Sequence, residues 1–189
     1  MFIYGVLRDI FQRYMLLGPY WKLFTYVLTI IFMKGIVIWS KYKQVQASRC
    51  MLIIILFFYL STVYISTVLA RSQMANEAEL LPALWSWRKV LSGERYVQYM
   101  VIENIIMLMP VGIIFPFIIN KNYVTLLTIL FGFAFSLFIE VSQKALHVGF
   151  FEMDDLMNNT IGVALGCAAS IGVKKLVKLK SLTTDINKR

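Results

Sequence analysis

The feature that most constrains this chain is an uninterrupted apolar run, residues 51–70, which reads MLIIILFFYLSTVYISTVLA and lies between Arg49 and Arg71. A helix that crosses a bilayer needs roughly 20 mostly apolar residues, and this run has that length. Four further stretches have the same character, although Lys34 weakens the first of them: 23–39, 99–119, 123–142 and 156–173. The sequence therefore predicts an all-α polytopic integral membrane protein, a helical bundle with about five transmembrane helices.

The overall composition agrees with a membrane protein. Hydrophobic residues make up 59% of the chain and charged residues 15%, with a mean hydropathy of +0.71. A soluble domain is about 45–50% apolar and about 25% charged, so an ordinary cytosolic enzyme, a disordered tail and a disulfide-rich scaffold are disfavoured. The net charge of +9 is explained by basic loops beside anionic lipids, so membrane lipids are expected partners and nucleic acid is not.

The chain divides into four predicted segments. Residues 1–22 form an N-terminal interfacial segment, because an apolar stripe runs through them with the charged residues off it. Residues 23–49 hold the first, weaker span and a cytoplasmic loop, and residues 50–173 form the main transmembrane domain. Residues 174–189 form a basic cytoplasmic tail.

The basic tail predicts the orientation in the cell membrane. Six basic residues and a single acid follow residue 173, so we expect the C-terminus of this multi-pass protein to be cytoplasmic. Counting back through the spans places the loops 71–98 and 143–155 outside. The N-terminus also comes out outside, which Arg8, Arg13 and Lys22 argue against, so its side stays open.

Polar residues from separate spans are predicted to meet at the outer membrane face. Glu140 and Gln143 are three apart, and Asp155 and Asn159 are four apart, so each pair shares a helix face. The connection between the two spans is short, so they should be antiparallel neighbours with these ends at one depth. The predicted cluster consists of Glu103, Asn104, Glu140, Gln143, Asp154, Asp155 and Asn159, with Arg71 beside them.

Two other interpretations of the aspartates stay open. Asp154 and Asp155 open the last span, and acids are favoured at a helix N-terminus, so capping alone could account for one of them. Carboxylates that lie close together repel, which calls for a cation, either Arg71 or a metal. No cofactor and no catalytic residue is predicted, but Glu140, Asp154 and Asp155 offer the oxygen ligands that a divalent cation takes.

The loop 71–98 contains Trp85, Trp87 and Arg88. Tryptophans of this kind commonly anchor a loop at the membrane interface, which is the favoured interpretation. The alternative is a lip that binds an amphipathic ligand. His147, the single histidine, is expected to be an interfacial loop residue rather than a catalyst.

Small residues mark a packing face on the last span. Gly162 and Gly166 are four apart, and such spacing lets two helices approach closely. We expect them to hold the last span against another helix, and a homodimer through the same two glycines would be a second use of this face.

Three motifs follow one another along the chain. They are Asn104-x5-Pro110-Val-Gly112, Glu140-x2-Gln143, and residues 151–162, which read FEMDDLMNNTIG. In this order they resemble the VanZ-like family of small bacterial membrane proteins, and the resemblance covers roughly residues 50–173. It implies a contribution to low-level resistance to teicoplanin-type glycopeptides, and it brings no biochemical mechanism with it.

The chain departs from the family pattern just before the Asp-Asp motif. Many members carry an arginine there, whereas this chain has Val148, Gly149 and Phe150. If that arginine pairs with the aspartates in the family, this chain has to use Arg71, Arg88 or no residue in its place.

Three functions are compatible with these features. The first is an envelope protein without catalysis that lowers glycopeptide susceptibility, with a glycopeptide antibiotic or a cell-wall precursor as its ligand. The second is a membrane-embedded enzyme that acts on a lipid-linked envelope precursor, with Glu103 as a base. The third is a lipid or small-solute transporter, which the absence of an internal repeat disfavours.

Overall fold

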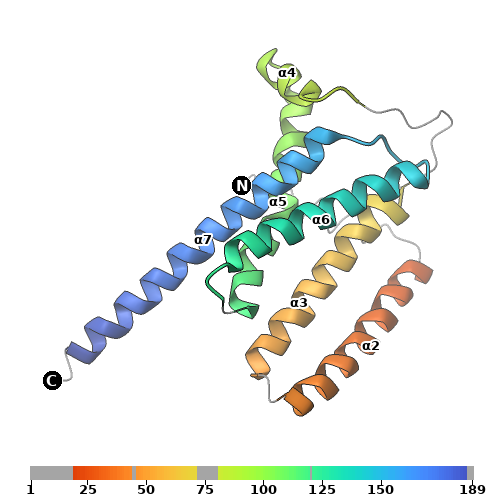
Figure 1. Cartoon of the computed structure of the whole chain (residues 1–189). Helices are drawn as coiled ribbons and strands as arrows, with labels where there is room; N and C mark the ends of the chain where they lie inside the picture. Colours follow the sequence, from red (N-terminus) through yellow and green to blue (C-terminus); the bar gives the residue numbers. More distant parts are fainter. Residues whose placement is uncertain (1–18, 44–45, 72–80, 120, 187–189) are drawn as a thin grey trace.

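The computed structural model describes residues 19–43, 46–71, 81–119 and 121–186. Residues 1–18, which make up most of the predicted interfacial segment, lie outside the described residues. Figure 1 shows the described part as a bundle of long helices with a short helix at one end.

The helices follow one another along the chain. They are α2 (Pro19–Lys43), α3 (Ala47–Tyr64), the π-helix η1 (Ile65–Leu69), α4 (Trp85–Leu91), α5 (Arg95–Ile118), α6 (Val124–Ala145) and α7 (Met153–Ile186). Five segments are long and apolar enough to cross a membrane: Lys22–Lys41, Ala47–Leu69, Arg95–Ile118, Val124–Ala145 and Met153–Val177. The prediction of an all-α polytopic membrane bundle is confirmed.

Two helices, α7 and α4, differ from the sequence-based expectation. α7 continues to Ile186, well past the predicted end of the last span at residue 173. Neither glycine nor proline follows Gly172, and the tail is rich in lysine and leucine, which are good helix formers. The short helix α4 lies in the loop 71–98, for which no helix was expected, and its stabilisation comes from outside the loop, as described below.

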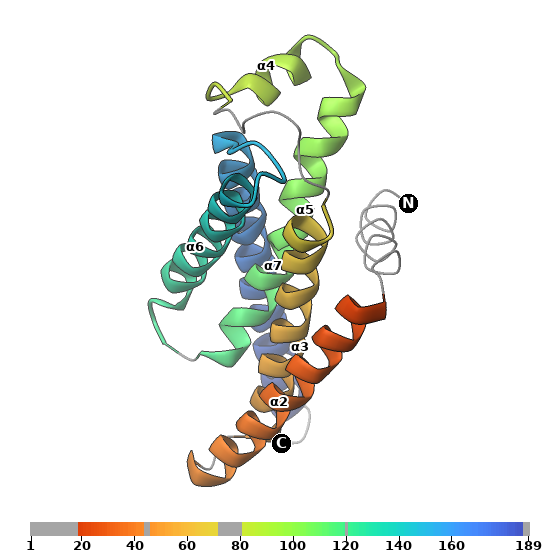
Figure 2. The ribbon, with the colours of Figure 1, turned by 90° about the vertical axis from the view of Figure 1, so that its right-hand side faces the viewer.

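α2 lies at the edge of the bundle and packs on α3 (Figure 2). Only 11% of its span is buried by the rest of the chain, against 39% of the α3 and α5 spans. The rings of Phe32 and Phe57 stack with their centroids 3.8 Å apart and join the two helices. The large apolar side chains on the other faces of α2 are exposed, as expected for a helix surrounded by lipid.

α7 packs most closely on α5, through glycine. A Cβ atom at Gly162 would overlap the carbonyl oxygen of Ile105, and one at Gly166 would overlap that of Met109. The expected close approach of two helices is therefore made within one chain. The idea of a homodimer through Gly162 and Gly166 needs correction, because α5 already covers this face.

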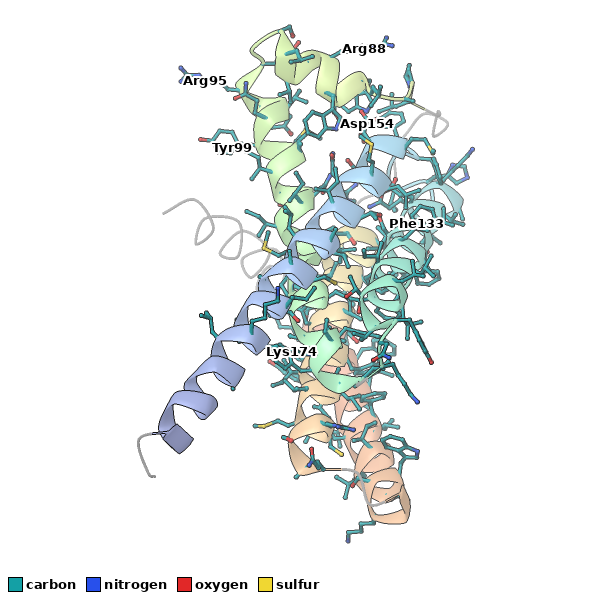
Figure 3. All side chains as sticks on the ribbon, turned by 60° about the vertical axis from the view of Figure 1, so that its left-hand side comes forward. Arg88, Arg95, Tyr99, Phe133, Asp154 and Lys174 are labelled. Atoms are coloured by element: carbon teal, nitrogen blue, oxygen red, sulfur yellow. The ribbon has the colours of Figure 1, made fainter. Side chains whose placement is uncertain are left out.

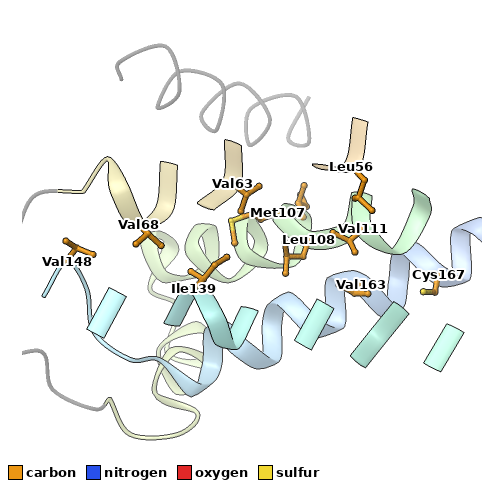
Figure 4. Packing of buried hydrophobic residues seen from close by; sticks show 11 residues of the cluster. Leu56, Val63, Val68, Met107, Leu108, Val111, Ile139, Val148, Val163 and Cys167 are labelled. Carbon is orange, nitrogen blue, oxygen red and sulfur yellow. The ribbon is translucent and has the colours of Figure 1, made fainter. Parts of the chain in front are cut away.

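The buried core joins α3, α5, α6 and α7 (Figure 4). Val63, Leu108, Val111 and Val163 at its centre are fully buried. Polar tyrosine and lysine groups tie the same helices together at the backbone, because the Tyr59 hydroxyl donates to the Met107 carbonyl at 2.6 Å and Lys174 Nζ donates to the Pro116 carbonyl at 2.7 Å. The Pro116 carbonyl is one of the last four of α5, which have no N–H partner within the helix, so it is free to accept the lysine.

Candidate functional site

α6 and α7 run antiparallel and meet in a regular series of side-chain pairs. Near the far end of the pair, Thr128 hydrogen-bonds Cys167. One turn along, a Cβ at Gly132 would run into the side chain of Val163.

The next turn pairs Ser136 with Asn159, whose Nδ2 donates to the serine Oγ at 2.8 Å. Each step advances four residues on α6 and goes back four on α7. The same step once more brings Glu140 opposite Asp155. The helix register therefore places these two carboxyl groups side by side at the end of the bundle.

Glu140 is 2% exposed and ties the end of α6 to the beginning of α7. Its Oε2 accepts a hydrogen bond from the backbone N–H of Glu152 at 2.9 Å. That N–H belongs to the residue just before α7, where backbone donors have no partner within the helix. The carboxyl group of Glu140 thus orients the whole first turn of α7.

Asp155 is half-buried and lies among charged groups from three parts of the chain. The side chain of Asn104, on α5, hydrogen-bonds its carboxyl group, and the charges of Glu140, Glu152 and Arg71 act on it. Among the predicted residues, the structure brings Arg71, Asn104, Glu140 and Asp155 together with Glu152. We call these five residues the Arg71 cluster.

Arg71 reaches the cluster from the end of η1. Its Nη1 lies 3.1 Å from the position that a Cβ would take at Gly149, and Gln143 Oε1 lies 3.3 Å from the same point. Gln143 in turn donates from Nε2 to the Thr67 carbonyl within η1, at 3.1 Å. Of the two arginines considered for the aspartates, Arg71 is the one whose charge acts on Asp155.

Asp154, although adjacent to Asp155, has different partners. Its Oδ1 accepts the backbone N–H of Leu84 at 2.6 Å, and its Oδ2 accepts the N–H and the hydroxyl of Ser86 at 2.8 and 2.7 Å. The residue is 2% exposed, and Leu84 adopts a left-handed backbone conformation with φ of 62°. Asp154 therefore caps α4 from across the chain, and Figure 3 shows it between the start of α7 and α4.

The two tryptophans complete this attachment. Trp85 Nε1 donates to Glu152 Oε2 and Trp87 Nε1 donates to Asn158 Oδ1, both at 3.1 Å. Both rings are half-buried. Their polar edges thus fasten α4 to the beginning of α7, a role that neither the interfacial anchor nor the ligand lip anticipated. Arg88, the third residue of the predicted lip, is exposed on α4.

Glu152 was not among the residues predicted for the cluster. Burial raises the pKa of its carboxyl group, while the Trp85 hydrogen bond and the Arg71 charge oppose that rise. Its position inside the FEMDDLMNNTIG motif was the signal that could have singled it out. Ser86 and Ser136, which bind Asp154 and Asn159, carried no such signal.

Glu103 and His147 are not members of the Arg71 cluster. Glu103 is half-buried on α5, next to Asn104. Within the described residues, no group of three His, Cys, Asp or Glu side chains is arranged to hold a metal ion, and both oxygens of Asp154 are occupied by α4. His147 is exposed in the turn after α6, with a φ of 55°.

Two buried side-chain atoms beside the cluster have no hydrogen-bond partner. They are Nδ2 of Asn158 and Oδ1 of Asn159, on neighbouring faces of α7. A buried polar atom without a partner costs about 1–3 kcal/mol. Both asparagines therefore mark this end of the bundle as a place where polarity is retained at a cost in stability.

Comparison with known proteins gives one match. A family model described as VanZ/LLP1 matches residues 47–174, from the first residue of α3 into the second half of α7. This range includes the whole Arg71 cluster and α4. No curated protein and no solved structure matches the chain.

Proposed function

Because this chain belongs to the VanZ/LLP1 family, we propose that it lowers the susceptibility of its cell to teicoplanin-type glycopeptides without catalysis. It does so from the end of the bundle that holds the Arg71 cluster and α4. In this proposal the protein lies in the cell membrane with the C-terminus in the cytoplasm, so that this end faces outward, as the basic tail favours.

The observation that carries the proposal is how α4 is held. A seven-residue helix with an exposed arginine and an exposed lysine is fastened over the start of α7 by Asp154, Glu152 and Asn158. Binding sites are precise when rigid neighbours hold them, and these contacts supply that rigidity. A non-catalytic role is supported by the hydrogen bonds of the buried carboxyl groups, since both oxygens of Asp154 and Oε2 of Glu140 accept backbone N–H groups.

The experiment is a chromosomal deletion complemented with variants, read as the minimal inhibitory concentration of teicoplanin. Wild type should restore resistance, whereas Asp155→Asn should not, although its level in the membrane is normal. Glu94→Gln is the matched control, because Glu94 forms an exposed ion pair with Lys89, with Nζ and Oε2 3.3 Å apart. A deletion strain as resistant as its parent would refute the proposal.

A membrane-embedded enzyme acting on a lipid-linked envelope precursor is the second candidate. It is favoured by one observation, the proximity of Asp155 and Glu152 to Arg71 while both acids remain half-buried. Accessible carboxyl groups beside a cation could bind a divalent metal or hold a phosphate ester. Binding of Mg²⁺ or Mn²⁺ to purified protein, abolished in Asp155→Asn, would favour the enzyme over the binding protein.

A further inference from the structure

An apolar groove runs along the membrane-spanning part of the bundle, outside the site described above. α3 and η1 form its floor, α2 one wall and α6 the other, an arrangement that can be followed in Figure 2. Its volume is about 470 Å³. The lining is almost wholly apolar and rich in aromatic rings, including Phe24, Phe57, Tyr64, Phe131 and Phe135.

Two stacked rings lie at one end of the groove, and we call the other end, at Leu69, its open end. The stacked rings of Phe32 and Phe57 join α2 to α3 at one end. From Phe57 the lining continues along the floor to Leu69, a distance of about 18 Å at 1.5 Å per helical residue. Arg71 follows two residues after Leu69, so the open end of the groove leads to the Arg71 cluster.

The apolar lining of the groove suits a hydrocarbon chain. The groove lies in membrane-spanning segments, where the surrounding solvent is lipid. The lining has two side-chain hydroxyl groups, those of Ser61 and Tyr64. The Tyr64 hydroxyl already donates a hydrogen bond to Ser142 Oγ at 3.2 Å.

The charges at the open end define a headgroup. Arg71 lies two residues past the lining residue Leu69, and its guanidinium can donate five hydrogen bonds, which suits a phosphate. Within the Arg71 cluster it is accompanied by the carboxyl groups of Glu140, Glu152 and Asp155, so acids exceed bases in the cluster by two. A ligand that carries both a phosphate and an ammonium group would complement these charges.

We propose that the groove holds one acyl chain of an aminophospholipid of the phosphatidylethanolamine type, with its phosphate on Arg71 and its ammonium group on Glu152 and Asp155. This proposal rests on the proposed function in one respect, because both treat the Arg71 cluster as a binding site. It names a lipid of the surrounding bilayer as the resident ligand of that site.

Binding of the acyl chain in the groove is tested by native mass spectrometry. The protein is purified from vesicles that contain phosphatidylethanolamine and phosphatidylglycerol in equal amounts. Wild type should retain phosphatidylethanolamine at least several-fold over phosphatidylglycerol. Ser61→Phe fills the groove and should lose the bound lipid. Ala134→Phe adds the same ring to the exposed face of α6 and should keep it. Ser61→Leu replaces the first variant if that does not accumulate.

The headgroup step is tested by charge-removing variants in the same vesicles. Arg71→Gln should lose retention of both lipids, whereas Arg95→Gln at the exposed start of α5 should behave as wild type. Glu152→Gln should abolish the preference for phosphatidylethanolamine while a lipid remains bound. Equal retention of the two lipids by wild type would overturn the headgroup assignment.

Other occupants of the groove are outcomes of the same measurement. Lipid retention unaffected by Ser61→Phe, or cross-links from the groove to residues 1–18 or to a second copy, would overturn the proposal. Lipid binding is measured on purified protein and teicoplanin susceptibility in cells. A failure of the lipid proposal is therefore distinguishable from a failure of the proposed function.

Discussion

The carboxyl group of Glu140, near the end of α6, accepts the backbone N–H of Glu152 at 2.9 Å, twelve residues further along the chain. This contact joins the last turn of one membrane-spanning helix to the first turn of the next. It also determines where Asp154 and Asp155 point, because both belong to that first turn of α7.

The contact between Glu140 and Glu152 predicts that a hydrogen-bond acceptor at position 140 matters more for stability than a negative charge does. Glu140→Gln keeps an oxygen acceptor and should remain folded. Glu140→Ala leaves the N–H without a partner and should cost about 1–3 kcal/mol of stability. Thermal unfolding in detergent measures both, and equal midpoints for the two variants would contradict the assigned contact.

Asp154 and Asp155 should not be interchangeable. A cap at the helix N-terminus tolerates asparagine, so capping alone predicts that Asp154→Asn and Asp155→Asn are equally mild. Asp154 accepts three hydrogen bonds on two oxygens, and an amide NH₂ in place of one oxygen would face a donor. Asp154→Asn should therefore release α4 and increase its hydrogen exchange, whereas Asp155→Asn should leave α4 protected.

Gly166→Leu should prevent the folded protein from accumulating. Its Cβ would overlap the Met109 carbonyl and press on the backbone of Gly112, which cannot move aside as a flexible side chain can. Gly172→Leu is the matched control, because a Cβ there meets nothing within 4 Å. Size-exclusion chromatography of the two variants measures the difference, and similar yields would show that α5 does not lie against Gly166.

The buried carboxyl group of Glu152 predicts a pH dependence of stability. Burial raises its pKa in the folded protein, so the folded state holds the proton more tightly than the unfolded state, where a glutamate has a pKa of about 4.3. The contribution to stability is therefore complete below that value and is lost as pH rises through the higher folded pKa. Unfolding midpoints should fall less steeply with pH in Glu152→Gln than in wild type; parallel curves would contradict this.

The orientation predicts opposite labelling at two serines. Ser92 follows α4 and is exposed, while Ser181 lies in the last part of α7. Cysteines introduced there should react with a membrane-impermeant reagent from outside at position 92 and only after permeabilisation at position 181. The two native cysteines are buried and give little background. The reverse pattern would place the Arg71 cluster in the cytoplasm.

The membrane class and the five spans were predictable from residue order. A run such as 51–70 must satisfy its backbone in hydrocarbon, and only a helix does that within one segment. The proximity of Glu140 and Asp155 was also predictable, since the short connection makes the two spans antiparallel neighbours with these ends at one depth. Arg71 was one of the cations considered for these carboxylates, with Arg88 and a metal ion as alternatives.

The tertiary structure alone decided which neighbour each of those side chains meets. Asp154 and Asp155 are adjacent and chemically identical, yet about 100° of helix rotation sends one to α4 and the other to Asn104 and Arg71. The partner of Gly162 and Gly166 is α5 of the same chain, a choice that a small-residue motif does not contain. Sequence periodicity determines the face on which a residue lies, whereas helix packing determines what lies opposite that face.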